Sequence, residues 1–377
     1  MRVGVPSEIK ADEHRVAVTP AGARELVAAG HEVIVQSGAG LGSAIADRDF
    51  AAQGARLVAD AEAVFAAAEL IVKVKEPQAV EVALLESRHV LFAYLHLAPD
   101  PNLTLGLRES GATCIAYETI VDSRGRLPLL APMSEVAGKL AAQGGAFLLQ
   151  RPLGGRGLLL GGVAGVPKGR VMVVGGGVVG RNAAAVALGL GADVRVYDRS
   201  LECLRELDLA FGQRLSTCHA SSLAIEEGLA DADLVIGAVL VQGARAPRVV
   251  NREQLGQMKA NAVMVDVSID QGGCFETSRP TTHSAPTYEV DGISHYCVAN
   301  LPGAVPITST YALAGATLPY LSRLAGSGVG AALGADPGFA KGLNVAAGSV
   351  THESVAGAHQ LDWIPPAEAL SALGVAG

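Results

Sequence analysis

Short apolar runs and longer amphipathic segments alternate along the first third of the chain. Each run is four to six residues long and consists mainly of small aliphatic residues, as expected of a strand buried on both faces. Helix-length segments separate the runs, so the order predicts βαβ units and a parallel sheet with helices on both sides. The five predicted strands are Arg2–Val5, Glu32–Val35, Leu70–Val74, Val90–Leu95 and Thr113–Ala116.

A second set of apolar runs follows a break at Asp122–Pro132, which is rich in glycine, proline and charged residues. Beyond this break, small and apolar residues recur at helical spacing from Met133 to Leu149. This spacing predicts a long helix that joins two domains, with Ser134 as its N-cap. Later predicted strands are Leu234–Ala238, Val263–Val267 and His295–Val298.

The pattern becomes helical again after Thr308, and the residues from there to about Gln360 are too few to build another sheet. We expect this segment to pack on the first domain. The predicted fold is therefore α/β, with two Rossmann-like parallel-sheet domains. A nucleotide-binding domain, residues 131–305, is inserted into a discontinuous substrate-binding and catalytic domain, residues 1–130 and 306–377. A chain of 377 residues is long enough for two such domains, each with its own core.

The segment Val171–Asp198 combines a buried strand, three spaced glycines, a helix-length stretch and a second strand that ends in an acid. This is the order of a dinucleotide-binding unit. Gly175 permits the tight turn, Gly177 lets backbone N–H groups approach a pyrophosphate, and Gly180 lets the helix pack closely on the sheet. The helix N-terminus attracts the phosphates. Asp198 would bind the ribose and repel a 2′-phosphate, which favours NAD over NADP, although Arg199 beside it weakens that preference.

Composition excludes several classes of protein. The chain is 50% hydrophobic but only 4% aromatic, with 46 glycines, which fits layers of small aliphatic residues rather than a disordered chain. A net charge of −8 without a basic run argues against nucleic-acid binding. The five cysteines lack CxxC or zinc-ligand spacing, so we expect reduced thiols. The chain has neither an apolar signal segment nor a run of ~18 apolar residues, so we expect a soluble, cytoplasmic protein without membrane contact.

Two basic side chains follow predicted strands of the first domain at their carboxyl ends, where ligands bind in parallel α/β sheets. Lys75 follows the strand that begins at Leu70, and His96 follows the strand that begins at Val90. A surface lysine and a core histidine are the alternative interpretations. Each alternative is reasonable for one residue alone, but the coincidence of both at neighbouring strand ends favours a site.

Arg15 and Asp270 complete the candidate set. Arg15 lies in a segment of alternating charge that would ordinarily be a solvated loop, yet a guanidinium can grip a carboxylate through two parallel hydrogen bonds. Lys75 could add a charge to the same anion or polarise its carbonyl. Asp270 follows the strand Val263–Val267 beside a glycine turn, so it is either an Asx-turn residue or an acid that faces the nicotinamide end of a dinucleotide. No GxSxG motif accompanies these residues.

Six ordered motifs carry a resemblance to a known family: MRVGVPSEIKADEHRVAVTPAG, KVKEP, YLHLAPD, MSEVAGK, VSIDQGGCFETSRPTTH and HYCVANLPGAVPITST. Together they resemble L-alanine dehydrogenase over nearly the whole chain. The resemblance implies reversible oxidative deamination of L-alanine to pyruvate and ammonium with NAD. It also implies two-domain subunits that assemble into a homohexamer.

The resemblance implies roles for single residues. Arg15 and Lys75 match the residues that bind the substrate carboxylate and keto group, and His96 and Asp270 match the acid–base pair. In the reductive direction, His96 would shuttle protons to and from the carbinolamine oxygen. The positions expected at the cofactor are Ser134, Gly175, Gly177, Val178, Val179, Gly180, Asp198, Val239, Leu240, Val267, Ser268, Ile269, Asp270, Arg279, Val298, Asn300 and Leu301.

The chain departs from the family pattern at five positions. Cys203 and Ala220 stand where relatives often carry a lysine and a serine near the adenosine, and Leu301 replaces a frequent methionine, so these positions bear on cofactor affinity. Arg323 and Ser327 replace the glutamate and histidine that hold magnesium in some relatives. We therefore expect no metal.

Other functions remain open on the sequence alone. The NAD(H)-binding component of a proton-translocating transhydrogenase shares the fold but passes hydride to a partner protein. A non-catalytic NAD(H)-sensing regulator would bind NADH without turnover. A saccharopine-dehydrogenase-like enzyme would need a wider pocket. Only a dehydrogenase that acts on alanine forms NADH from alanine and NAD by itself.

Overall fold

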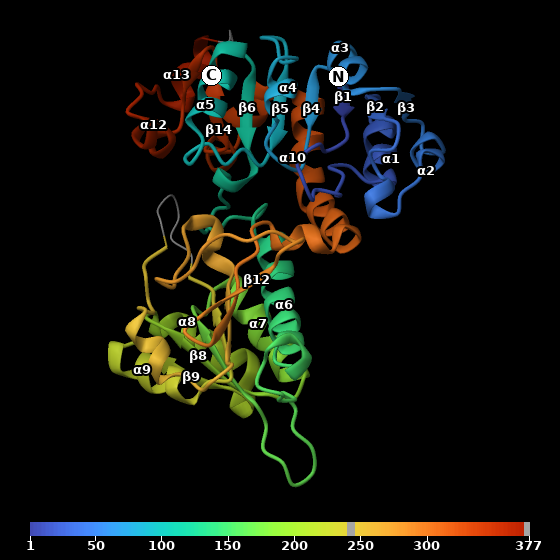
Figure 1. Cartoon of the computed structure of the whole chain (residues 1–377). Coiled ribbons are helices and arrows are strands. Elements are labelled where there is room, and N and C mark those ends of the chain that lie inside the picture. Colours follow the sequence, from blue (N-terminus) through green and yellow to red (C-terminus); the bar gives the residue numbers. More distant parts are fainter. Residues whose placement is uncertain (240–245, 373–377) are drawn as a thin grey trace. The chain divides into compact units, whose positions relative to one another are not determined.

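The computed structural model describes residues 1–239 and 246–372, so the predicted cofactor contact at Leu240 lies outside the described residues. The chain divides into two compact units. The first unit consists of Met1–Met133 with Val305–Gly377, and the second unit consists of Ser134–Ala304. Each contains a mostly parallel sheet with alternating helices, which confirms the predicted α/β fold (Figure 1).

The sheet of the first unit has the strand order β15-β14-β6-β5-β4-β1-β2-β3. Strands β1 to β6 are parallel, whereas β14 runs antiparallel to β6 and β15 antiparallel to β14. The chain therefore reverses its direction of winding between β1 and β4, and such a switch point opens a crevice for ligands at the carboxyl ends of the strands. The strands are β1 (Arg2–Val5), β2 (Glu32–Gln36), β3 (Arg56–Val58), β4 (Leu70–Val72), β5 (Val90–Ala93), β6 (Thr113–Ala116), β14 (Leu343–Ala346) and β15 (Ser349–Val350).

Some helices of the first unit begin at side-chain caps that the sequence supplies. Thr19, Asp60 and Asp100 each accept a hydrogen bond from a backbone N–H in the first turn of the helix that follows. The helices are α1 (Pro20–Ala28), α2 (Asp47–Ala51), α3 (Ala61–Ala67), α4 (Ala79–Val82), α5 (Pro101–Ser110), α10 (Pro306–Gly334), α11 (Pro337–Ala340), α12 (Glu353–His359) and α13 (Pro366–Ala372).

The second unit repeats this winding in the strand order β12-β13-β11-β10-β7-β8-β9, with its switch point between β7 and β10. Only β12 runs antiparallel among its described strands. The strands are β7 (Arg170–Val174), β8 (Asp193–Asp198), β9 (Ser216–His219), β10 (Leu234–Gly237), β11 (Val263–Asp266), β12 (Thr287–Val290) and β13 (Ile293–Tyr296). The helices are α6 (Ala131–Leu148), α7 (Val178–Gly189), α8 (Leu201–Phe211) and α9 (Ser222–Asp231).

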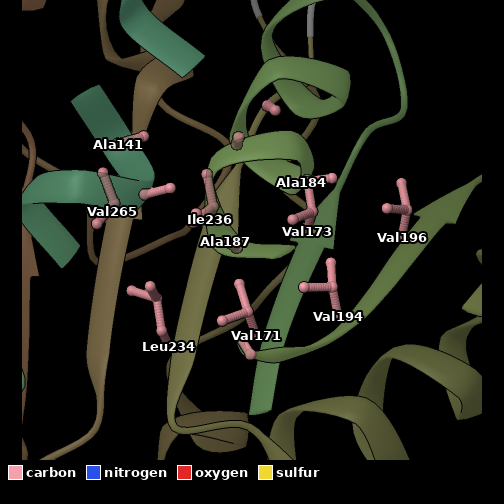
Figure 2. Close-up of a cluster of buried hydrophobic side chains, with 14 of the residues drawn as sticks. Ala141, Val171, Val173, Ala184, Ala187, Val194, Val196, Leu234, Ile236 and Val265 are labelled. Carbon is pink, nitrogen blue, oxygen red and sulfur yellow. The ribbon is translucent and has the colours of Figure 1, made fainter. Parts of the chain in front are cut away.

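One face of this second sheet packs against helices that present small side chains. Figure 2 shows Val171, Val173 and Ile236 of the sheet together with Ala184 and Ala187 of α7, all of them buried. Alanine side chains are small, so α7 can pack closely on the sheet. The N-terminus of α7 therefore lies close to the carboxyl end of β7. Among the described residues, no helix is both long enough and apolar enough to cross a bilayer.

Several element boundaries differ from the predictions. Helix α6 begins at Ala131, so Ser134 lies inside the helix and is not its N-cap. The segment after α10 builds no separate sheet, as expected, and it adds two strands that the sequence did not predict, β14 and β15, to the edge of the first sheet. Strands β4 and β5 end two residues earlier than predicted. The N–H groups of Val74 and Leu95, at the ends of the predicted strands, donate to the Glu8 and Glu118 carboxylates instead of a neighbouring strand.

Candidate active site

Four adjoining strands of the first sheet, β6, β5, β4 and β1, are each followed by an ionisable residue. Glu8 follows β1, Lys75 follows β4, His96 follows β5 and Glu118 follows β6. Because parallel strands end at the same edge of a sheet, these side chains gather at one place. This place includes the switch point between β1 and β4.

The backbone at His96 is held in an unusual conformation. His96 has a φ of 47°, in the left-handed region that costs a residue with a side chain about 1 kcal/mol or more. The Glu118 carboxylate accepts a hydrogen bond of 2.7 Å from the His96 N–H and one of 3.1 Å from the Leu95 N–H. The imidazole stacks on the Tyr94 ring, with 5.7 Å between the ring centroids and 3° between the planes. The ring orientation is therefore fixed by contacts on both the backbone and the side chain.

The charges around His96 keep its imidazole neutral. Burial, with the ammonium group of Lys75 as the second cause, lowers the pKa of His96 to about 3. Lys10 and Arg15 act in the same direction, whereas the Glu76 carboxylate opposes them. Because 38% of the His96 side chain remains exposed, solvent weakens the effect of burial on its pKa, but the pKa stays below its usual value. A neutral ring at pH 7 is a proton acceptor.

Lys75 is buried beside a carboxylate. Its Nζ lies 3.7 Å from Oε2 of Glu76, and the Lys10 ammonium bonds to the other oxygen of the same carboxylate. Glu76 is partly buried, which by itself would raise its pKa, but Lys75 and other cations outweigh this effect and lower it. Glu76 therefore stays ionised and balances part of the positive charge at this edge.

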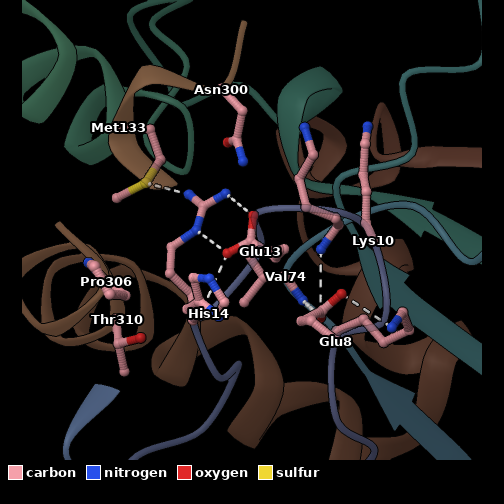
Figure 3. A network of polar contacts seen from close by, with 12 residues as sticks. Glu8, Lys10, Glu13, His14, Val74, Met133, Asn300, Pro306 and Thr310 are labelled. Carbon is pink, nitrogen blue, oxygen red and sulfur yellow. Dashed lines mark hydrogen bonds and ion pairs between the residues drawn. The ribbon is translucent and has the colours of Figure 1, made fainter. Parts of the chain in front are cut away.

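Arg15 is only 2% exposed, so the interpretation of a solvated loop residue is wrong. Its Nε and Nη2 bond to the two oxygens of Glu13 at 2.6 Å and 2.5 Å, and its Nη1 lies 3.0 Å from the Met133 sulfur (Figure 3). Burial alone would lower the pKa of Arg15, but the bonds and charge of Glu13 raise it. A thioether is a weak hydrogen-bond acceptor, whereas a guanidinium bonds most strongly to carboxylates such as that of Glu13.

A buried ion-pair network lies directly behind Lys75. Lys73 is fully buried and donates to Glu8 at 3.0 Å and to Glu81 at 2.7 Å. Burial would lower the pKa of Lys73, but the two carboxylates raise it, so the ammonium group stays charged. Glu8 also accepts a hydrogen bond of 2.6 Å from the Val74 N–H (Figure 3). Removing one member of such a network leaves an uncompensated buried charge.

The acidic residues of this region were missed in the sequence. Glu8, Glu13, Glu76 and Glu118 all contact or surround the predicted basic residues. The rule that singled out Lys75 and His96, an ionisable residue just beyond a buried strand, also applies to Glu8 and Glu118. Glu13 gives no such signal, because its partner Arg15 is two residues away in a loop without regular periodicity.

The glycine turn of the second unit has the geometry that its sequence predicts. Gly175 has a φ of 100°, and a Cβ at this position would lie 2.4 Å from the Ala238 carbonyl oxygen. A Cβ at Gly180 would lie 1.8 Å from the Gly175 oxygen, so the helix can approach the turn only without a side chain there. Gly177 is the N-cap of α7 and has open space around its Cα. The turn thus leaves room for a ligand at the helix N-terminus, where backbone N–H groups attract phosphate.

Asp198 ends β8 and binds this turn. One carboxylate oxygen accepts from the Gly176 N–H at 2.7 Å and the other accepts from the Ser200 N–H at 2.8 Å. Each oxygen has a second lone pair, so the carboxylate can also accept from ribose hydroxyls. Cys203 is next to it, and burial and the Asp198 charge raise the pKa of the Cys203 thiol to about 11, which keeps it protonated.

The loop after β11 is organised by a fully buried acid. Asp266 accepts hydrogen bonds from the Ser268 N–H at 2.9 Å and the Cys274 N–H at 2.8 Å. Ser268 in turn accepts from the Val239 N–H at 3.0 Å, which joins the ends of β10 and β11. Asp270 lies exposed on the 3-10 helix Val267–Gln271 that this network supports.

The other predicted cofactor positions differ in their surroundings. Val298 and Leu301 are buried in a small apolar cluster with Ala137, so they offer a ligand their backbone and not their side chains. The Arg279 guanidinium lies 4.1 Å from the centroid of the Tyr288 ring. Asn300 has a φ of 59°, in the left-handed region. Of the remaining positions, Ile269 is buried and Val178 is exposed, while Ser134, Val179, Val239 and Val267 are half-buried.

The sites of the second unit fit a bound dinucleotide. The open glycine turn, the helix N-terminus and a carboxylate at the end of the second strand are the donor and acceptor groups that a pyrophosphate and a ribose require. In residues 1–239 and 246–372, no three histidine, cysteine or acidic side chains gather as metal ligands. Arg323, at a position considered above for magnesium, pairs with Asp336 at 3.0 Å.

Comparison with known proteins gives consistent matches over almost the whole chain. Residues 4–137 match the family model of the alanine dehydrogenase/PNT N-terminal domain, and residues 141–353 match that of the C-terminal domain. The alanine dehydrogenase of Halomonas elongata is 56% identical over 374 residues, which is 99% of this chain and 100% of the relative. A solved L-alanine dehydrogenase superposes with a TM-score of 0.92 at 49% identity, covering 96% of this chain and 99% of the other.

A more distant match is the solved transhydrogenase from Sinorhizobium meliloti, with a TM-score of 0.79 and 27% identity over 94% of this chain and 100% of the other. Its sequence identity to this chain is about half the identity of the alanine dehydrogenases to this chain. These matches agree with the motifs, with the glycine turn and with the strand-end residues described above. The chain belongs to the alanine dehydrogenase/PNT family.

Proposed function

We propose that this protein catalyses the reversible oxidative deamination of L-alanine to pyruvate and ammonium with NAD. The observation that carries the proposal is the 56% identity to an alanine dehydrogenase over essentially the full length of both chains. The basic residues at the strand ends of the first unit support the proposal, because a small carboxylate would find positive charge there.

NAD is the cofactor that the second unit would hold. Its pyrophosphate would bind at Gly177, Val178 and Val179, where the N-terminus of α7 is open, and its ribose would bind Asp198. When bound, the nicotinamide would accept a hydride from the substrate carbon. The loops that carry Val239 and Ser268 are tied together by a hydrogen bond, so they offer a rigid wall to the nicotinamide end.

The substrate carboxylate would bind Arg15 and Lys75. The hydrogen bonds to the Glu13 carboxylate already restrict rotation of the Arg15 side chain. Little conformational entropy would therefore be lost when Arg15 binds the substrate carboxylate. Lys75 would polarise the keto group of pyruvate by hydrogen bonding to its oxygen. The two cations repel each other less when an anion lies between them, which favours a carboxylate over a neutral ligand.

His96 and Asp270 would handle protons and charge. The neutral His96 ring would accept a proton from the carbinolamine hydroxyl in the oxidative direction and return it in the reductive direction. Asp270 would stabilise the cationic nitrogen of the imine that forms on the substrate. We further propose that the protein works as a homohexamer in the cytoplasm, and its mass in solution tests the first of these statements.

The purified chain should produce NADH from L-alanine and NAD without any partner protein, as followed by absorbance. His96→Ala and Asp270→Asn should each reduce turnover by more than tenfold while NADH still binds. Activity within tenfold of the parent would remove the substituted residue from catalysis. Binding of NADH without turnover in the parent itself would instead favour the regulator, and hydride transfer only with a partner would favour the transhydrogenase component.

A further inference from the structure

Two half-buried glutamates bond to the backbone at the two strand ends that carry the candidate catalytic residues. In the sheet order β6-β5-β4-β1, the inner strands β5 and β4 lead to His96 and Lys75, and the outer strands β6 and β1 lead to Glu118 and Glu8. The carboxylate after β6 thus contacts the end of β5, and the carboxylate after β1 contacts the end of β4.

The hydrogen bonds show where the sheet ladder stops and the carboxylates begin. The Tyr94 N–H still donates to the Val74 carbonyl oxygen at 3.1 Å, as in a regular parallel ladder. Beyond that point, the Leu95 and His96 N–H groups donate to Glu118. On the neighbouring strand, the Val74 N–H donates to Glu8 at 2.6 Å and the Lys75 N–H donates to the same oxygen at 3.4 Å.

Both carboxylates are fixed in place. Lys73 bonds the second oxygen of Glu8 at 3.0 Å, and it is held by Glu81 on its other side. The Glu118 side chain is 18% exposed and lies on the short 3-10 helix Tyr117–Thr119 that continues β6. A carboxylate accepts hydrogen bonds about twice as strong as those of a neutral oxygen, so each can hold two N–H groups in one direction.

The conformation at His96 needs such a restraint. A histidine at a φ of 47° is favoured only where its surroundings impose it. The Glu118 oxygen at 2.7 Å from the His96 N–H supplies that restraint directly on the strained residue. Without it, the backbone is free to relax towards an extended conformation, which turns the imidazole away from its present direction.

We propose that Glu8 and Glu118 are positioning residues, whose carboxylates hold the backbone of the strand ends carrying Lys75 and His96. This proposal rests on the proposed function, since it assigns the two glutamates to the substrate-binding lysine and the proton-transferring histidine of alanine oxidation. Glu118 acts through His96, and Glu8 acts through Lys75. Neither glutamate reacts with the substrate.

The test separates the two positions by kinetics. Glu118→Gln puts an amide N–H where an oxygen now accepts from Leu95, so kcat should fall at least tenfold while the KM for pyruvate stays within threefold. Glu8→Gln should raise the KM for pyruvate at least tenfold while kcat stays within threefold. A role limited to stability would change both constants together at both positions.

Glu69→Gln is the matched control. Glu69 accepts a hydrogen bond of 2.9 Å from the Arg2 N–H, the same kind of contact at the opposite end of the same sheet. Both its kinetic constants should stay within twofold of the parent. Glu118→Asp and Glu8→Asp keep the charge but shorten the reach by one methylene, and they should show the same split as the Gln variants. Kinetic constants within twofold of the parent in the Gln variants would overturn the proposal.

Hydrogen exchange of the unaltered protein tests the contacts even if a variant does not fold. The N–H groups of Val74, Leu95 and His96 lie beyond the sheet ladder, yet they should exchange at least a hundredfold more slowly than exposed amides. Rapid exchange there would overturn the proposal. A parent that forms no NADH from alanine while these amides stay protected would refute the proposed function and leave the backbone contacts established.

Discussion

His96 and Lys73 show how the same sheet edge treats two basic residues in opposite ways. Lys73 is fully buried but keeps its charge, because two carboxylates lie within hydrogen-bond distance. His96 is more exposed but stays neutral, since burial and the nearby Lys75 both oppose its protonation. The two carboxylates outweigh burial at Lys73, whereas at His96 burial and the nearby cations act in the same direction. A neutral base beside fixed cations is what transfer of a proton near a carboxylate requires.

Arg15 should tolerate no exchange for lysine. Arg15→Lys keeps the charge but removes the planar fork that binds Glu13 and that can bind a carboxylate through two parallel hydrogen bonds. We therefore expect the KM for pyruvate to rise at least tenfold and the KM for NADH to stay within twofold. Steady-state kinetics in the reductive direction measure both constants. Arg56→Lys, an exposed arginine that pairs with Glu32 on the same sheet, is the control and should change neither constant. Equal changes in both Michaelis constants of Arg15→Lys would contradict its role in binding the carboxylate.

His89 should make stability depend on pH. Its Nδ1 accepts from the Glu86 N–H at 2.8 Å and its Nε2 bonds the Phe65 carbonyl at 2.9 Å, so the buried ring fits these partners only when neutral, and burial lowers its pKa. The unfolded chain protonates this histidine below about pH 6.5 and the folded protein does not, so His89 lowers the free energy of unfolding as the pH falls.

His89→Asn keeps an acceptor for the Glu86 N–H but cannot be protonated. The variant should be less stable than the parent near pH 7, and its free energy of unfolding should fall less steeply between about pH 7 and about pH 5. Denaturant unfolding at several pH values measures both effects. His219→Asn replaces an exposed histidine and should leave the slope unchanged. A slope for His89→Asn as steep as that of the parent would show that His89 is not a source of the pH dependence.

At the scale of elements, apolar runs predicted most strands, and the ends of those strands were predicted less well. Periodicity identifies β4 and β5 because their residues are buried on both faces. It does not reveal that the N–H groups of Val74 and Leu95 leave the hydrogen-bond ladder of the sheet. Both residues are as apolar as the strands, and their N–H groups donate to carboxylates that are distant in sequence. Strand β3 escaped prediction because it has three residues, none of them buried.

The close contact between α7 and the glycine turn makes a prediction about this element. Gly180→Ala places a Cβ against the Gly175 carbonyl oxygen, and the backbone must shift, so we expect a loss of about 1–3 kcal/mol in stability and a weaker affinity for NADH. Gly189→Ala, at the end of the same helix with nothing near its Cα, should keep its affinity and gain up to about 1 kcal/mol. Thermal unfolding and NADH fluorescence titration measure the two effects. Equal behaviour of the two variants would show that the helix does not need its close approach.

At the scale of the whole molecule, both units wind their sheets in one order and place their candidate residues at the carboxyl ends next to the switch point. The sequence predicted parallel sheets with ligands at the carboxyl ends of the strands, because apolar runs that alternate with helices are typical of parallel α/β folds, but it did not predict the strand order. It did not reveal β14, which pairs with β6 more than 200 residues away in the chain, or β15, which pairs with β14. Contacts that distant leave no trace in local periodicity.

In the second unit, this winding places Asp198 at the carboxyl end of β8, so the intact protein should bind NADH more tightly than NADPH. A ligand that binds only the folded protein stabilises it by about 2.7 kcal/mol at a hundred times its dissociation constant. NADH should therefore raise the unfolding temperature in a concentration-dependent manner. NADPH at equal concentration should raise it much less, because its 2′-phosphate would lie against the Asp198 carboxylate, which the Gly176 and Ser200 N–H groups hold at the end of β8. Equal shifts with the two cofactors would contradict the role of Asp198, and restoration of the NADPH shift in Asp198→Ser would support it.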